Sequence, residues 1–137
     1  MKFLVLILAL IPTFAHADMA GVNFGFGQGS ASESYGVDYE IQRGLPYIDI
    51  GVSHSTGVWN PSVSAGAQWS IINVGVALSQ SFVSGGTNQF AAGPELGLMA
   101  NLTSLFYVKE NSQMLFDLRN SPHTHSFGTS VAVGVNL

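Results

Sequence analysis

The sequence predicts an all-β fold, an up-and-down antiparallel transmembrane β-barrel of eight strands. Three observations support this prediction. Short stretches in which apolar and polar residues alternate follow one another along the chain, and a period of two is typical of strands. Charged residues make up only 9% of the chain, against roughly 25% in ordinary soluble domains. The polar face of the strands is mostly Gly, Ser, Ala and Asn, which suits the crowded interior of a small barrel better than a surface in water.

The first residues, MKFLVLILALIPTFAHAD, have the organisation of a secretory signal peptide. Lys2 supplies a positive charge, an apolar run of nine residues follows, and Ala15-His16-Ala17 fits the small-x-small cleavage pattern. Nine residues are too few to span roughly 30 Å of hydrocarbon, which argues against a membrane anchor. We therefore expect residues 1–17 to be removed on export and residues 18–137 to form the barrel domain.

The first three strands are expected at residues 19–28, 33–42 and 47–55. In each of them every second residue is apolar, and the residues between are mostly small, polar or acidic. The apolar positions are Val22, Phe24 and Phe26 in the first, Tyr35, Val37, Tyr39 and Ile41 in the second, and Ile48, Ile50 and Val52 in the third.

The fourth and fifth strands lie in PSVSAGAQWSIINVGVALSQSF, residues 61–82, with a tight turn near residues 69–72. Trp59 and Trp69 are ten residues apart and share the apolar face of the fourth strand. Ten residues correspond to roughly 33 Å along a strand, or about 25 Å of height at a tilt of about 40°. This is the height of the apolar band between the aromatic girdles of a membrane barrel. Trp59 and Trp69 are therefore predicted to lie at the two membrane interfaces.

The last three strands are expected at residues 88–100, within 104–119, and at 125–137. Pro94 interrupts the sixth strand, because proline lacks the N–H that a ladder uses, so we expect a bulge at Gly93-Pro94 or a shorter strand. The seventh strand is the least regular, and a hairpin around KENSQ would divide it and give nine strands. The eighth alternates from Phe127 to Leu137.

The connections between these strands are of two kinds. GSASE, STGVWN, VSGGTN and NSPHTH follow the first, third, fifth and seventh strands, whereas the tighter RGLP, WSII and NLTS follow the second, fourth and sixth. This order is expected of a barrel with its loops at the outer end and short turns at the periplasmic end. Outer loops this short argue against a large adhesive surface.

The C-terminal strand carries the clearest resemblance to a known family. The segment SFGTSVAV, with Ser126, Gly128, Val131 and Val133 at the pattern positions, resembles the barrel-insertion signal polar-x-Gly-x-x-apolar-x-apolar of the small OmpA/OmpX-like outer-membrane β-barrels of Gram-negative bacteria. Most of that family end in an aromatic residue, whereas this chain ends in Leu137. The resemblance implies a location in the bacterial outer membrane. It also implies contact with outer-membrane lipid and the barrel assembly machinery, and it leaves room for an unidentified protein partner.

The strand parity places most of the charged side chains inside the barrel. Buried charges must be paired or hydrated, so we expect an interior network of salt bridges and hydrogen bonds. A narrow pathway for ions or a small solute is the alternative, but the interior of an eight-stranded barrel is filled by side chains. The residues expected in this interior network are Asp38, Glu40, Asp49, Glu95, Lys109, Asp117 and Arg119.

Other classes of function find little support in the sequence. There is no basic cluster, which argues against nucleic-acid binding. The pair His123-x-His125 lies in a predicted loop, far around the ring from His54, so we expect no metal site. The GFGQGS segment lacks the spacing of a phosphate loop. We therefore expect no cofactor and no catalytic residue.

We therefore expect a structural or interaction role, and two alternatives to it remain. A lipid A-modifying membrane hydrolase is suggested by SHST (His54, Ser55) and HTHS (His125, Ser126). In both segments the His and Ser are adjacent, so in a strand they point to opposite faces. The second alternative is a soluble exported β-sandwich that binds a partner.

Overall fold

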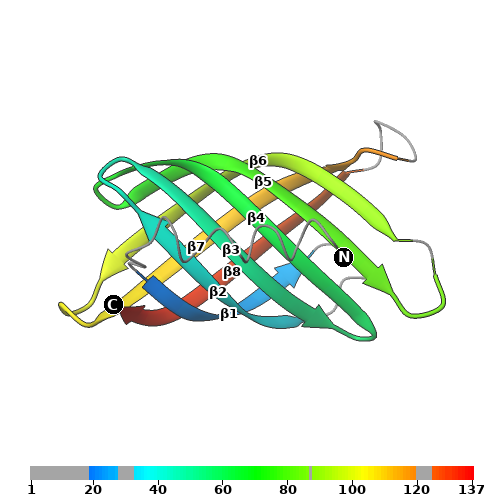
Figure 1. Ribbon diagram of the computed structural model, residues 1–137, viewed down its shortest axis with the longest axis horizontal. Coiled ribbons are helices and arrows are strands. Elements are labelled where there is room, and N and C mark those ends of the chain that lie inside the picture. The colour runs from blue at the N-terminus through cyan, green and yellow to red at the C-terminus, as the bar shows by residue number, and fades with distance from the viewer. Residues whose placement is uncertain (1–18, 28–32, 87, 120–124) are drawn as a thin grey trace.

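The computed structural model describes residues 19–27, 33–86, 88–119 and 125–137, and the predicted signal peptide lies outside them. The described residues form a closed barrel of eight antiparallel strands, each paired with the next and the last with the first (Figure 1). No helix among them is long and apolar enough to cross a membrane. The strands are β1 (Met19–Gly27), β2 (Ser34–Gln42), β3 (Pro46–Ser55), β4 (Val58–Trp69), β5 (Ile72–Val83), β6 (Gln89–Asn101), β7 (Phe106–Asp117) and β8 (His125–Asn136).

The predicted all-β, up-and-down barrel is confirmed, and the exported β-sandwich is wrong because a single closed sheet surrounds one lumen. The nine-strand alternative is also wrong. Residues 109–113, the KENSQ segment, pair with β6 on one side and with β8 on the other without interruption. β7 is therefore one continuous strand.

Pro94 is accommodated without the predicted bulge or shortening. β6 pairs with β7 up to Ala92 and again from Glu95 onward in the same register. Pro94 itself pairs with Val76 on the β5 side. The proline therefore interrupts one ladder locally and inserts no extra residue into β6.

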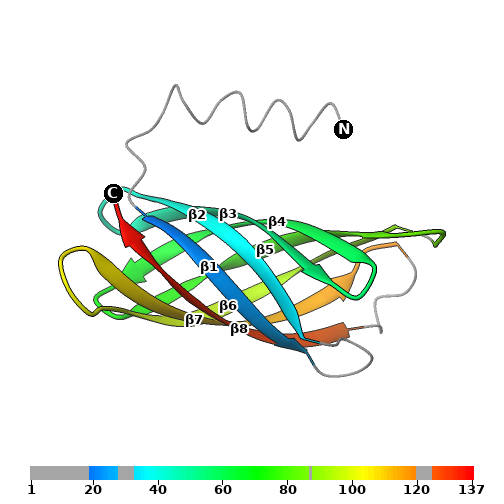
Figure 2. The same ribbon diagram turned by 90° about the horizontal axis from the view of Figure 1, so that it is seen from below.

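The described connections fall at two ends of the barrel, as Figures 1 and 2 show. The turns β2–β3, β4–β5 and β6–β7 lie at one end, here called the turn end, together with the C-terminus. The opposite end is called the loop end. The predicted six-residue loop STGVWN is wrong, because β3 and β4 pair as far as Ser55 and Val58. Only Thr56 and Gly57 remain for the turn, and Gly57 has a φ of 72°.

The polarity of the two faces of the sheet is the reverse of that in a water-soluble protein. Large apolar side chains from every strand are exposed on the outside, for example Phe24 (51%), Val76 (57%) and Leu96 (57%). The inside contains buried polar and charged side chains: Asp38, Glu40, Asp49, Ser64, Gln68, Asn73, Glu95 and Lys109. The prediction that the small polar face points inward is confirmed.

Candidate functional site in the barrel lumen

A buried group of charges crosses the lumen toward the turn end. Lys109 on β7 donates hydrogen bonds to Glu40 on β2 and to Asp49 on β3, with 2.6 Å between Lys109 Nζ and Asp49 Oδ2. Glu40 and Asp49 are direct partners in the β2–β3 register, so two like charges stand side by side. Since like charges opposite each other are destabilising, the Lys109 ammonium group is what makes this arrangement stable.

Two tyrosines fill the lumen around this ammonium group. Tyr47 and Tyr107 are 2% and 1% exposed, and Lys109 Nζ lies 5.4 Å from the Tyr47 ring centroid, within the range of a cation–π contact. Each hydroxyl ends against a glycine: a Cβ added at Gly75 would overlap the Tyr47 hydroxyl, and one at Gly21 would overlap that of Tyr107. The two glycines therefore make room for the rings. We call Tyr47, Tyr107, Lys109, Glu40 and Asp49 together the lumen floor.

Glu95 on β6 is the next buried carboxylate. It accepts hydrogen bonds from the Tyr47 hydroxyl at 2.9 Å and the Ser64 hydroxyl at 3.2 Å, and also from the side-chain amide of Gln113. Three neutral donors therefore stabilise this carboxylate, although none of them is a cation. Hydrogen bonds to an ionised group are stronger than neutral ones, which allows Glu95 to be 2% exposed.

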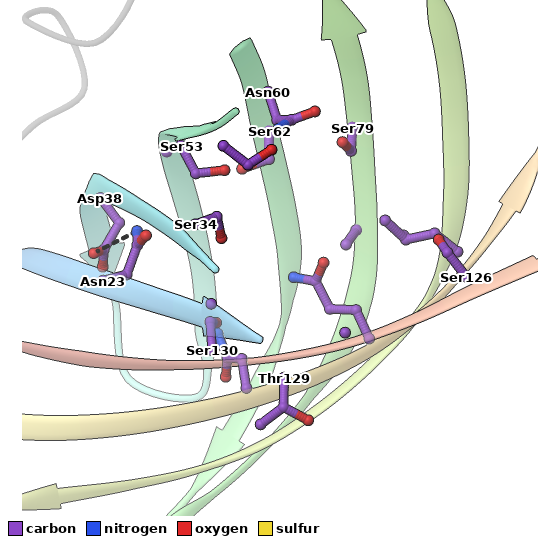
Figure 3. Close-up of a pocket in the computed structure, with 18 of the residues that line it drawn as sticks. Asn23, Ser34, Asp38, Ser53, Asn60, Ser62, Ser79, Ser126, Thr129 and Ser130 are labelled. Atoms are coloured by element: carbon purple, nitrogen blue, oxygen red, sulfur yellow. Dashed lines mark hydrogen bonds between the residues drawn. The ribbon is translucent and has the colours of Figure 1, made fainter. Parts of the chain in front are cut away.

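A cavity of about 670 Å³ lies on the loop-end side of the lumen floor. It reaches from Asp49, Glu95 and Lys109 to Ser55 and Thr56 beside the β3–β4 turn. Figure 3 shows polar side chains from several strands that point into this space. The wall residues include Asn23, Ser34, Ser53, Asn60, Ser62 and Ser79.

The structure places most of the predicted interior residues in the lumen. Asp38, Glu40, Asp49, Glu95 and Lys109 are all buried there. Three of them form ion pairs and Glu95 is held by neutral donors, whereas Asp38 accepts a hydrogen bond from the Asn23 side-chain amide at 3.3 Å and lies beside the Tyr107 hydroxyl.

Two predicted members lie apart from this group at the loop end. Asp117 is half-buried at the end of β7, and its carboxylate accepts a hydrogen bond from the Arg119 backbone N–H at 2.8 Å. The prediction that Arg119 points into the barrel is wrong. β7 ends at Asp117, so strand parity no longer governs Arg119, which is exposed and donates to the Asn88 carbonyl.

Models of protein families and curated proteins were both compared with the chain, and neither comparison finds a match. A solved structure does match it. The chain is similar in fold to the N-terminal β-barrel domain of OprF from Pseudomonas aeruginosa. The TM-score is 0.59 at 14% sequence identity, and the match covers 88% of this chain and 98% of the OprF chain. The resemblance to small outer-membrane barrels is thus confirmed for the fold, and identity this low carries nothing further from OprF.

The two tryptophans lie at opposite ends of β4, on the outer face of the barrel. Trp59 is 56% and Trp69 53% exposed. Trp59 belongs to a row of rings across three neighbouring strands. The centroid of the His54 ring lies 4.6 Å from that of Trp59 and 5.5 Å from that of Tyr35. His54 therefore packs between two aromatic rings on the outer face. That Trp59 and Trp69 mark membrane interfaces stays a prediction.

The residues of the two predicted hydrolase segments are divided between the faces, as their adjacency requires. His54 and His125 lie outside against aromatic rings, whereas Ser55 and Ser126 line the lumen cavity. Neither segment brings its His and Ser together.

The residues of the predicted insertion signal alternate between the two faces of β8. Ser126 and Gly128 line the cavity. Val131 and Val133 have the outward parity, and Val133 is 47% exposed. Their role in insertion is not addressed by the OprF likeness and stays a prediction.

A polar group on the outer face was not predicted from the sequence. Glu110 on β7 pairs in register with Leu98, an outward residue, and its carboxylate accepts a hydrogen bond from Ser112 at 2.8 Å. Ser112 is also 3.0 Å from the Thr129 hydroxyl on β8. Glu110 shares its parity with Met114 and Phe116, so extending that alternation backwards would have predicted its outward position.

Proposed function

We propose that the chain is a small integral outer-membrane β-barrel protein with a structural or interaction role rather than an enzymatic one. The observation that carries the proposal is the inverted barrel, with exposed apolar side chains outside and buried charges inside. An exposed apolar surface of this extent marks contact with a membrane or a partner. Lipid is favoured, because the apolar side chains come from every strand around the ring.

Strand length supports the same proposal. The strands contain from 9 to 13 residues, and a tilted membrane-spanning strand needs about 9–11. A closed barrel also has no free sheet edge, so backbone N–H and C=O groups are paired around the ring apart from local interruptions such as that at Pro94. This pairing is the condition for placing strands in hydrocarbon.

The lumen floor supports a structural role over conduction. Tyr47, Tyr107 and the Lys109 ion pairs fill the lumen with buried side chains, and each tyrosine hydroxyl reaches a glycine on another strand. A solute could cross only if these side chains separated, which would leave buried charges without partners.

Cell fractionation combined with heat-modifiability tests the proposal. The full chain should be recovered with the outer membrane, and it should migrate faster on SDS gels unheated than boiled, because a closed barrel resists unfolding by detergent. The N-terminus of the recovered protein should be Asp18. Recovery in the soluble periplasm without detergent would contradict the proposal.

A further inference from the structure

Glu110 is a charged side chain on the outer face, at a depth where the proposed membrane is apolar. Within the eight described strands it is the only Asp, Glu, Lys or Arg residue with the outward parity. Its depth follows from a row of directly paired residues that rises around the barrel from Trp69 on β4 back to Trp59 on β4, in the order Ile72, Leu98, Glu110, Val131, Phe24, Tyr35, His54 and Trp59. Glu110 is the third residue of this row, so it lies about 9 Å along the height of about 25 Å between the two tryptophans.

Glu110 belongs to a small polar group on β7 and β8, which lie side by side (Figure 2). Its carboxylate accepts a hydrogen bond from the Ser112 hydroxyl at 2.8 Å, and Ser112 Oγ is 3.0 Å from the Thr129 hydroxyl. An ionised carboxyl group can accept about four hydrogen bonds, but Ser112 is its one donor in the described part of the chain. Glu110 is half-buried rather than covered, so its side chain is accessible from outside the barrel.

We propose that this outer face of β7 and β8 binds another membrane-spanning protein segment, which presents a lysine or arginine to Glu110. The inference rests on the proposed membrane location. A charged side chain inside a bilayer is costly, and such residues are usually paired and mark functional sites. An ammonium or guanidinium group at the same depth supplies the counter-charge that the Ser112 and Thr129 hydroxyl groups cannot supply.

A second copy of the chain does not meet this requirement. Equivalent residues lie at equal depth when a two-fold axis runs along the membrane normal, so an interface centred on Glu110 would bring two carboxylates together. The described cations of the chain lie elsewhere. Lys109 is held in the lumen, and Arg43 and Arg119 lie beyond the strand ends. Lipid does not meet the requirement either, because charged headgroups lie at the interfaces and acyl chains fill this depth.

Model peptides in vesicles test the proposal. The full chain is purified in mild detergent and reconstituted in phosphatidylcholine vesicles with a dansyl-labelled, membrane-spanning leucine peptide that has one lysine near its centre. Energy transfer from the tryptophans of the barrel to the dansyl group should saturate with this peptide. The same peptide with leucine in place of lysine should give only the transfer expected from random mixing.

A charge-removing variant and its matched control make the test specific. Glu110→Gln should weaken binding of the lysine peptide by about tenfold, because the charge-assisted contact is lost. Glu33→Gln removes the same charge from an exposed residue before β2 and should bind the peptide like the unaltered protein. Unchanged binding by a heat-modifiable Glu110→Gln barrel would overturn the proposal, as would equal energy transfer to the lysine and leucine peptides.

Two further measurements complete the design. A dimer of the barrel alone that is lost in Glu110→Gln, observed by sedimentation equilibrium, would overturn the proposal and assign this face to a second copy. If Glu110→Gln does not form a barrel, the unaltered protein decides. The lysine peptide, but not the leucine peptide, should then shift the backbone amide NMR signals of Ser112 and Thr129, and the absence of this difference would overturn the proposal. A barrel that fractionates with the outer membrane yet binds both peptides alike would contradict this inference and leave the proposed function standing.

Discussion

Lys109 and Glu110 are adjacent in the sequence, yet they place opposite charges in opposite surroundings. The Lys109 ammonium group lies in the lumen between two carboxylates, whereas the Glu110 carboxylate lies on the apolar outer face with only hydroxyl donors beside it. Lys109 is buried, and a bilayer around the barrel would also keep Glu110 from water, so the free energy of each depends on its immediate partners. The two residues should therefore respond to substitution with opposite signs.

Replacing Lys109 with methionine should lower the free energy of unfolding by about 3–5 kcal/mol, because Glu40 and Asp49 would remain buried and mutually repelling. Urea unfolding in detergent or lipid measures the change. The triple variant with Glu40→Gln and Asp49→Asn should recover most of the loss. A triple variant no more stable than Lys109→Met would contradict this account.

Replacing Glu110 with leucine should raise the free energy of unfolding by about 1 kcal/mol in a bilayer. The reason is that a charged side chain on the lipid face of a membrane barrel is destabilising, less so for Glu than for Lys or Arg. The same replacement at Glu33, exposed before β2, serves as the control and should have little effect. A Glu110→Leu barrel that is less stable would contradict this account, because it would show that the hydrogen bond from Ser112 outweighs the cost of the charge.

At the scale of the element, strand parity accounts for most of what could be predicted from the sequence. It places Tyr47 inside and Trp59 outside, because alternate side chains must face opposite ways. It could not predict that Tyr47 ends against Gly75, since this contact depends on which distant strands face each other across the lumen. Parity gave the wrong direction for Arg119, because β7 has already ended there. Composition gave too long a loop at STGVWN, because the strands remain paired through residues that are typical of loops.

The β3–β4 turn provides a prediction about backbone conformation. Gly57 has a φ of 72°, in the left-handed region that costs other residues about 1–2 kcal/mol, so Gly57→Ala should destabilise the barrel by about 1 kcal/mol. Ser70 in the β4–β5 turn has a φ of 56°, and Ser70→Gly should relieve a similar cost. Urea midpoints should therefore move in opposite directions. A shift of both in one direction would contradict the argument.

The outward valines of β8 provide a test of the insertion signal. Changing Val131 and Val133 together to asparagine should reduce recovery in the outer membrane more than the same change at Val74 and Val76 of β5. Both pairs have the outward parity, so the cost of polar groups on the outer face is shared, and only the β8 pair lies in the predicted recognition pattern. Equal recovery of the two variants would show that this segment has no special role in assembly.

For the whole molecule, the proposed membrane location predicts how deep the two tryptophans lie in a bilayer. Trp59 and Trp69 lie at opposite ends of β4, so one is expected near each interface. Single-tryptophan proteins made by Trp59→Phe or Trp69→Phe should both be quenched more by lipids brominated near the headgroup than by lipids brominated at the chain centre. Stronger quenching of either tryptophan by lipids brominated at the chain centre would contradict its placement at an interface.

The lumen floor also has a consequence for the order of assembly. Glu40 and Asp49 precede Lys109 by 69 and 60 residues. The β2–β3 hairpin therefore holds two adjacent carboxylates whose counter-charge lies on a distant strand. Entry of that hairpin into hydrocarbon by itself would carry both charges unpaired, a cost of several kcal/mol for each ion. Stepwise insertion from the N-terminus is thereby disfavoured, and the first strands have to wait for the seventh. We therefore expect the Lys109 ion pairs to form as the strands enter the membrane rather than afterwards.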